Sequence, residues 1–158
     1  MINRELIVHQ QVCDYLRLQY PRAIFHSDHE GGRKRHRTEQ ANIKRLNSSR
    51  AWPDLFIAEP SVTLTFSGDT GDLPTDGPFY KWAGLFIELK AEDIYLKRPP
   101  GNILKADKHL QEQNDMLIKL RLKGYKAEFA VGFYQAKAII DEYFHNKPEA
   151  QFTDKEFF

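Results

Sequence analysis

A short segment near the middle of the chain, Ile87-Glu88-Leu89-Lys90, places a carboxylate and an ammonium group at the end of an apolar run. Successive side chains of a β-strand point to opposite faces, so Glu88 and Lys90 share one face while Leu89 points to the other. A second carboxylate, Asp54, begins another apolar segment. Two carboxylates beside a lysine can hold a divalent cation and orient a water molecule. That is the chemistry of metal-dependent phosphodiester hydrolysis.

Each half of this pattern also has a simpler interpretation. Asp54 can begin a strand or accept a turn hydrogen bond, and a Glu-x-Lys pair on an exposed strand is a solvated ion pair that contributes little to stability. Two more polar residues, Glu5 and Gln113, interrupt the apolar stripes of two expected helices. Singly, Glu5 is a first-turn acid favoured by the helix dipole and Gln113 a residue with a local hydrogen bond. Together with Asp54 and the Glu-x-Lys pair, they would place five polar groups around one cleft.

Length and composition limit the class of protein. The chain has 158 residues, 41% of them hydrophobic, which fits one globular domain with a substantial core. A single cysteine, Cys13, excludes an intramolecular disulfide and fits a reducing compartment. We find neither a run long enough to span a membrane nor the apolar region of a signal peptide. We therefore expect a cytoplasmic protein with no membrane partner.

The net charge of +1 conceals an uneven distribution of charge. Residues 22–50 contain eight Lys/Arg and three Asp/Glu, whereas residues 51–93 contain two Lys/Arg and eight Asp/Glu. A basic segment beside an acidic one suits a protein that binds phosphates next to a carboxylate cluster, although such runs are as often solvated loops. The cations that we expect to contact backbone phosphates are Arg33, Lys34, Arg35, Arg37, Lys44, Arg45, Arg50, Lys97 and Arg98.

Hydrophobic periodicity and turn residues predict the order of the elements. Helices are expected over residues 4–19, 107–123 and 136–144, and strands over 23–26, 54–58, 62–66, 85–90 and 127–131. Residues 27–50, with a helical turn around 39–46, and residues 67–78 and 92–107 are expected to be loops. This order indicates an α/β sandwich with a central mixed β-sheet flanked by α-helices.

The ordered set of motifs resembles the PD-(D/E)xK nuclease superfamily, and within it the small stand-alone VRR-Nuc domain proteins of phages and bacteria. The resemblance covers most of the chain: the helix with Glu5, the glycine- and cation-rich segment 29–33, segments 52–57 and 84–90, and the helix that begins near 112–114. It implies a restriction-endonuclease-like nuclease domain over residues 1–145 and a polar tail over 146–158. Trp52, where such proteins usually have a small residue, and the long segments between strands are departures from the pattern.

The resemblance implies a role for each acidic residue of the site. Asp54 and Glu88 would bind the metal, with the backbone carbonyl of Leu89 as a further ligand. Glu5 would help to hold the metal through a water molecule or a second ion. Oxygen ligands without a Cys/His cage suit Mg²⁺, for which Mn²⁺ can substitute.

The remaining roles complete the expected function. Lys90 would orient or activate the attacking water, and Gln113 would support the site from the long helix. The resemblance thus implies an Mg²⁺-dependent endodeoxyribonuclease that acts as a homodimer on duplex DNA or on branched DNA such as four-way junctions. Two alternatives stay open: a non-catalytic DNA-binding or recruitment module on the same fold, and an RNA-processing nuclease.

Overall fold

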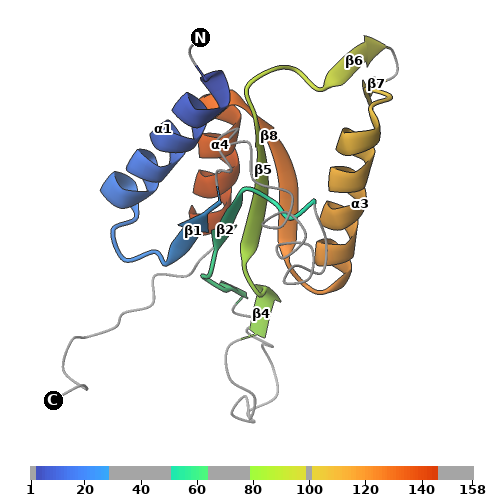
Figure 1. The fold of residues 1–158 in the computed structure, drawn as a ribbon. Helices are drawn as coiled ribbons and strands as arrows, with labels where there is room; N and C mark the ends of the chain where they lie inside the picture. The colour runs from blue at the N-terminus through green and yellow to red at the C-terminus, as the bar shows by residue number, and fades with distance from the viewer. Residues whose placement is uncertain (1–2, 29–50, 64–78, 99–100, 146–158) are drawn as a thin grey trace, which may run out of the picture.

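The computed structural model of the protein describes residues 3–28, 51–63, 79–98 and 101–145 (Figure 1). Within these ranges lie three helices, α1 (Arg4–Gln19), α3 (Lys108–Leu122) and α4 (Gly132–His145). The strands are β1 (Phe25–Ser27), β2 (Leu55–Ile57), β3 (Ser61–Thr63), β4 (Phe79–Trp82), β5 (Leu85–Lys90), β6 (Tyr95–Arg98), β7 (Gly101–Leu104) and β8 (Lys126–Val131).

Four of the strands form a mixed central sheet in the order β1-β2-β5-β8. The β1–β2 and β2–β5 pairs are antiparallel and the β5–β8 pair is parallel. Helices α1 and α4 cover one face of this sheet and α3 covers the other (Figure 1). The expected α/β sandwich with a mixed sheet between helices is therefore confirmed.

Strand β5 lies in the interior of the sheet and carries residues of both core clusters. Leu85, Ile87 and Leu89 belong to the cluster under α1 and α4, whereas Phe86 belongs to the cluster under α3. A strand buried on both faces needs apolar side chains on both, which explains the unbroken apolar run. Glu88 is the exception, because it occupies the α3 face and is only 2% exposed.

Several expected boundaries match the structure, and others do not. The helix over 4–19 and the strand over 85–90 have the expected bounds. The expectation of a loop over 92–107 is wrong, because β6 and β7 pair there as an antiparallel hairpin. Strand β4, which pairs with β3, was not expected either.

Helix α4 begins at Gly132, four residues before the expected start. The Val131 backbone N–H at this end donates to Oε1 of Gln135 at 2.5 Å, so a side chain of the first turn satisfies a backbone donor there. The loops expected over 29–50 and 67–78 and the tail over 146–158 lie outside the described residues. In the described part of the chain, none of the helices combines the length and hydropathy needed to cross a bilayer.

Candidate functional site

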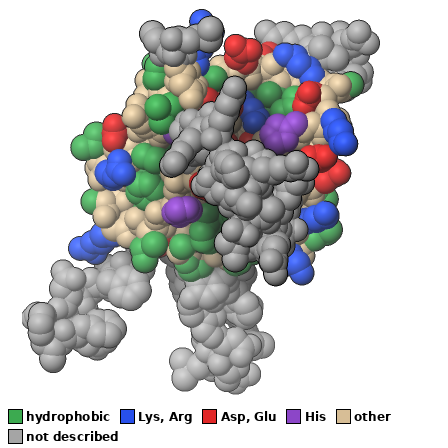
Figure 2. Space-filling view, viewed as in Figure 1, with side chains coloured by type: hydrophobic (Ala, Val, Ile, Leu, Met, Phe, Trp, Pro, Cys, Tyr) green, Lys and Arg blue, Asp and Glu red, His purple; other side chains and the backbone are tan. Residues whose placement is uncertain are grey.

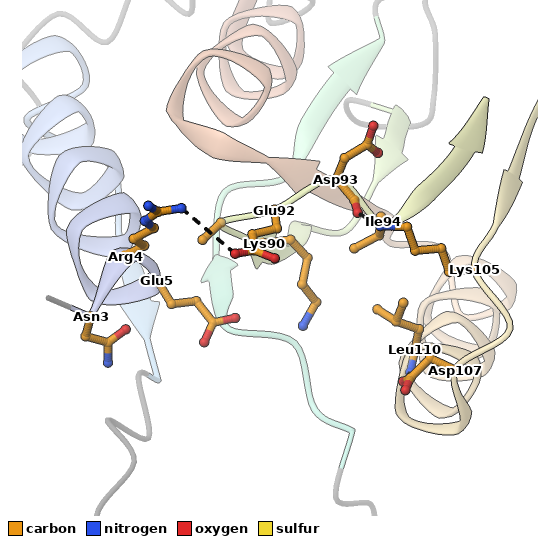
Figure 3. Close-up of a pocket in the computed structure, with 11 residues that line it drawn as sticks. Asn3, Arg4, Glu5, Lys90, Glu92, Asp93, Ile94, Lys105, Asp107 and Leu110 are labelled. Carbon is orange, nitrogen blue, oxygen red and sulfur yellow. Dashed lines mark hydrogen bonds and ion pairs between the residues drawn. The ribbon is translucent and has the colours of Figure 1, made fainter. Parts of the chain in front are cut away.

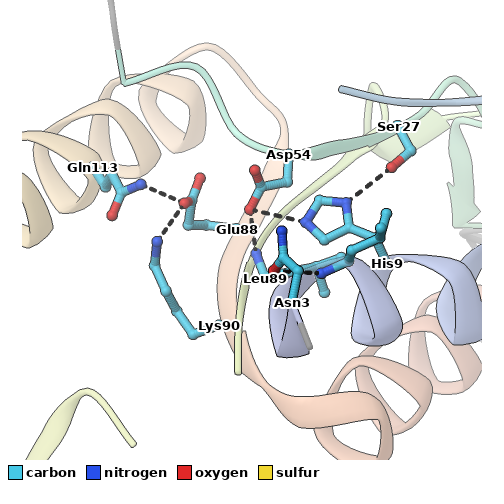
Figure 4. A network of polar contacts seen from close by, with 9 residues as sticks. Asn3, His9, Ser27, Asp54, Glu88, Leu89, Lys90 and Gln113 are labelled. Atoms are coloured by element: carbon cyan, nitrogen blue, oxygen red, sulfur yellow. Dashed lines mark hydrogen bonds and ion pairs between the residues drawn. The ribbon is translucent and has the colours of Figure 1, made fainter. Parts of the chain in front are cut away.

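The antiparallel pairing of β2 and β5 brings the two candidate metal ligands together. Leu55 lies opposite Ile87 in this pair. Asp54, which directly precedes β2, therefore comes level with Glu88 near the end of β5. The two carboxyl groups lie close enough to share a hydrogen bond and face one another in Figure 4. Two segments separated by more than thirty residues thus place their carboxyl side chains next to each other, as the sequence predicted.

Glu88 is held by a cation and an amide on the α3 side of the sheet. Its Oε1 accepts a hydrogen bond from Nζ of Lys90 at 2.8 Å and another from Nε2 of Gln113 (Figure 4). Gln113 is 6% exposed and belongs to the buried stripe of α3 with Leu117 and Leu120. The glutamine therefore occupies an interior position, as its spacing predicted, and its amide points at the carboxylate of the central strand.

Asp54 is held from the opposite direction. Its Oδ2 accepts a hydrogen bond from the Leu89 backbone N–H at 2.9 Å. The same oxygen lies 3.7 Å from Nε2 of His9, whose side chain is buried against the sheet from α1. Nδ1 of His9 in turn lies 3.2 Å from Oγ of Ser27 on β1. The role that the resemblance gives to the Leu89 carbonyl stays a prediction.

Both carboxyl groups have raised pKa values. Burial raises the pKa of Glu88 to about 8, the Asp54 charge adds to the rise, and Lys90 opposes it. Burial also raises the pKa of Asp54, against the lowering effects of the Leu89 N–H and the Lys90 ammonium. Two acids that compete for one local cation keep their protons more readily than free carboxyl groups do. A further positive charge at this point would relieve that competition.

The donor set fits a hard divalent cation. Oε1 of Gln113 is buried and makes no hydrogen bond within the described part of the chain, so an oxygen donor is left over beside the carboxylate pair. Among the described residues, no group of three or more His, Cys, Asp or Glu side chains gathers as a metal cage. Two carboxylates completed by amide or backbone oxygens and water is the pattern of Mg²⁺ rather than zinc.

Glu5 differs from its expected placement. It is exposed in the first turn of α1 rather than buried on the apolar stripe. Its carboxylate is nevertheless near enough to raise the pKa of Asp54. Glu5 and Lys90 both extend into a pocket of about 730 Å³ between α1 and the start of α3 (Figure 3). Glu5 thus lies at the entrance of the site, in reach of solvent, and the pocket gives access to Lys90.

The cations expected to contact DNA are only partly described. Lys97 and Arg98 lie on β6, in the hairpin beyond the pocket. The seven expected between residues 33 and 50 lie outside the described residues. On the face shown in Figure 2, the described Lys and Arg side chains alternate with Asp and Glu along the rim. The described part of this face therefore has mixed charge.

His9 is a site residue that the sequence did not reveal. It lies on the inward side of α1 with Val12 and Leu16, four residues after Glu5. The helical spacing 5-9-12-16 contained this signal. A lone histidine among apolar positions is more often a satisfied core residue than a functional one, and only the position of Asp54 distinguishes the two.

Comparison with known proteins identifies the fold. A solved structure described as a VRR_NUC domain protein superposes on this chain with a TM-score of 0.58, over 93% of each chain, at 18% sequence identity. No protein-family model matches the sequence, and no curated protein does. The chain therefore has the restriction-endonuclease-like fold of a VRR_NUC domain, with two carboxylates, a lysine and a glutamine gathered near the end of its central strand.

Proposed function

We propose that this protein is a metal-dependent nuclease that hydrolyses phosphodiester bonds in DNA. The observation that carries the proposal is the pair of adjacent carboxyl groups, Asp54 and Glu88, which share their site with Lys90 and with a buried amide oxygen of Gln113 that has no partner in the described residues. The fold similarity to a VRR_NUC domain protein supports the nuclease class. A site that only bound DNA would gain nothing from buried carboxylates next to phosphates.

The residues of the site would divide the work as follows. Asp54, Glu88 and the Gln113 amide oxygen would hold Mg²⁺, with the Leu89 carbonyl as a backbone donor. When bound, Mg²⁺ supplies positive charge that polarises the scissile phosphate and makes a nearby water more acidic. The Lys90 ammonium, on the pocket side of Glu88, would orient that water and offset the negative charge that develops on the phosphate.

Glu5 and the surrounding surface would complete the substrate site. Glu5, exposed at the pocket entrance, would hold water at the edge of the metal site. Lys97, Arg98 and the cations between residues 33 and 50 would grip backbone phosphates without reading base sequence. We further propose a homodimer as the acting form, because two-fold symmetry presents two sites to two strands, and branched DNA as a preferred substrate.

The first experiment measures cleavage of end-labelled duplex DNA, four-way-junction DNA and matched RNA with Mg²⁺, with Mn²⁺ or with EDTA. We expect cleavage of DNA with either metal and none with EDTA. Glu88→Gln and Lys90→Met should each lower the cleavage rate by at least about 100-fold, because each removes charge that acts in the transition state. Glu112→Gln and Lys119→Met, at exposed positions of α3, are the matched controls and should cleave at the wild-type rate.

Other outcomes would replace the proposal. Full activity of Glu88→Gln or Lys90→Met would show that the reaction takes place elsewhere. Salt-dependent DNA binding without cleavage under any metal condition would identify a non-catalytic DNA-binding or recruitment module. Cleavage of RNA alone would identify an RNA-processing nuclease.

A further inference from the structure

His9 is a buried titratable residue that the proposed chemistry does not use. The residue is 3% exposed, although Glu5, one helical turn earlier on the same face of α1, is open to solvent. The imidazole lies between a polar partner on β1 and a second one that directly precedes β2. Nδ1 is 3.2 Å from Oγ of Ser27, and Nε2 is 3.7 Å from Oδ2 of Asp54 (Figure 4).

The two contacts have different strengths. The Ser27 contact is a hydrogen bond by distance, whereas 3.7 Å is too long for one, so His9 meets Asp54 as a close electrostatic neighbour. A neutral imidazole with its proton on Nε2 suits this arrangement, because Nδ1 can then accept from the serine hydroxyl while a polar N–H faces the carboxylate. Ser27 would thereby set the orientation of the ring, and the ring would present the correct nitrogen to Asp54.

The position of these contacts on Asp54 matters for metal binding. His9 and the Leu89 backbone N–H approach the same oxygen, Oδ2. Neither of them approaches Oδ1, and Glu88 faces the carboxyl group from the other side (Figure 4). A carboxylate held through one oxygen cannot rotate freely, so the other oxygen keeps a fixed direction. Groups that orient metal ligands in this way commonly affect metal affinity strongly.

We propose that His9, oriented by Ser27, is a positioning residue that fixes the Asp54 carboxylate for binding the metal. This inference rests on the proposed function, since it needs Asp54 to be a metal ligand. It also goes beyond that function, because it assigns a role to a Ser27–His9–Asp54 chain that links β1 and α1 to the site. It makes the first helix part of the metal site even though His9 itself touches no metal.

Two amide substitutions of His9 test the contributions of its two ring nitrogens separately. Gln places an N–H donor near the position of Nε2, and Asn places a polar group near that of Nδ1. His9→Gln should therefore keep the contact with Asp54, whereas His9→Asn should lose it. Val12→Ala, at a fully buried position on the same helix, is the control for a loss of packing without a change near Asp54.

The experiment measures Mn²⁺ binding to the full chain without DNA, by electron paramagnetic resonance of free Mn²⁺ at one fixed pH, with melting temperatures measured alongside. We expect His9→Asn to weaken Mn²⁺ binding by about 10- to 100-fold. His9→Gln should recover most of the affinity, Ser27→Ala should fall between the two, and Val12→Ala should bind as the wild type does despite a lower melting temperature.

Three results would overturn the inference. If His9→Asn binds Mn²⁺ with wild-type affinity while Glu88→Gln loses binding, the proposed metal site would be supported but His9 would have no role in it. Equal losses in His9→Asn, His9→Gln and Val12→Ala that follow the melting temperatures would show a purely structural histidine. Failure of the wild type itself to bind Mn²⁺ would overturn the proposed function together with this inference.

Discussion

The burial of Glu88 links the protonation of one acid to the stability of the fold. The pKa of Glu88 in the folded chain is about 8, above its ordinary value of 4.5, chiefly because the group is buried. Its neighbours at Oε1, Lys90 and Gln113, donate to an oxygen that would carry negative charge only after a proton has left. Burial therefore favours the protonated form of this carboxyl group, and the Lys90 ammonium favours the ionised form.

This linkage predicts a pH-dependent stability in the absence of metal. Between pH 4.5 and pH 8 the folded chain keeps the Glu88 proton that the unfolded chain releases, so the free energy of unfolding falls as the pH rises. We expect a loss on the order of 3 kcal/mol between pH 5 and pH 8 in EDTA, measured by denaturant unfolding. Glu88→Gln should remove most of this dependence.

The control for that measurement is Glu112→Gln, which changes an exposed acid on α3 and should leave the pH dependence as it is in the wild type. Excess Mg²⁺ should raise the stability of the wild type more at pH 8 than at pH 5, because protons and metal compete for the same carboxylates. An identical pH dependence in the wild type and Glu88→Gln would contradict the assigned pKa.

The placement of most candidate site residues could be predicted from the sequence, and the exceptions have physical reasons. Glu88 and Lys90 follow from strand alternation, Asp54 from its place at the start of a second apolar segment, and Gln113 from the helical stripe. Glu5 was expected in the interior, but the first turn of α1 leaves its side chain in solvent, and a periodic pattern carries no information about where a helix leaves the core. His9 was missed because the sequence pattern indicates only that this histidine is buried and does not show what it contacts. Its neighbour Asp54 lies 45 residues away in the chain.

At the scale of elements, β5 is the part of the fold that positions the site. The residue directly before this strand, Gly84, is tightly packed. A Cβ atom there would lie 2.9 Å from the ring of Phe56 and 3.0 Å from the carbonyl oxygen of Ile57. The glycine therefore allows β2 and β5 to approach, and this approach sets the register that brings Asp54 level with Glu88. The requirement is for space and not for an unusual backbone angle.

Gly84→Ala should consequently lower the free energy of unfolding by about 1–3 kcal/mol, because the added methyl group overpacks the start of the strand. Denaturant unfolding measures the loss. Phe56→Leu removes the nearest ring atoms, so the double variant should be more stable than the sum of the two single changes predicts. Strict additivity would show that the ring is not the source of the strain.

Elements could be predicted wherever local pattern and burial agree. The amphipathic helix over Arg4–Gln19 and the apolar strand over Leu85–Lys90 were expected with the correct bounds. The β6–β7 hairpin was not expected, because the dipeptide Pro99-Pro100 and the nearby charges suggested a loop. A strand was expected over 62–66, where the structure has β3, but its partner β4 was not expected, because a local pattern does not show pairing between separate segments of the chain.

At the scale of the whole molecule, we expect the electrostatic part of DNA affinity to come from basic residues that lie away from the carboxylates. Replacing both Lys97 and Arg98 by Ala should weaken DNA binding and lower the slope of log affinity against log salt concentration by up to about 2. Fluorescence anisotropy at several salt concentrations, in EDTA to prevent cleavage, measures this slope. The double variant Lys119→Ala/Lys123→Ala, at the C-terminal end of α3, is the control. An unchanged slope in the β6 variant would exclude the hairpin from the DNA interface.

The parallel pairing of β5 with β8 has a consequence for the life of the protein in the cell. Parallel neighbours require a long connection between them, and here that connection contains α3 with Gln113, 25 residues after Glu88. A nascent chain that has left the ribosome only as far as β5 therefore has both carboxylates but lacks the helix that covers them. The amide that donates to Glu88 is therefore added late in synthesis, after both carboxylates and Lys90 have already been made.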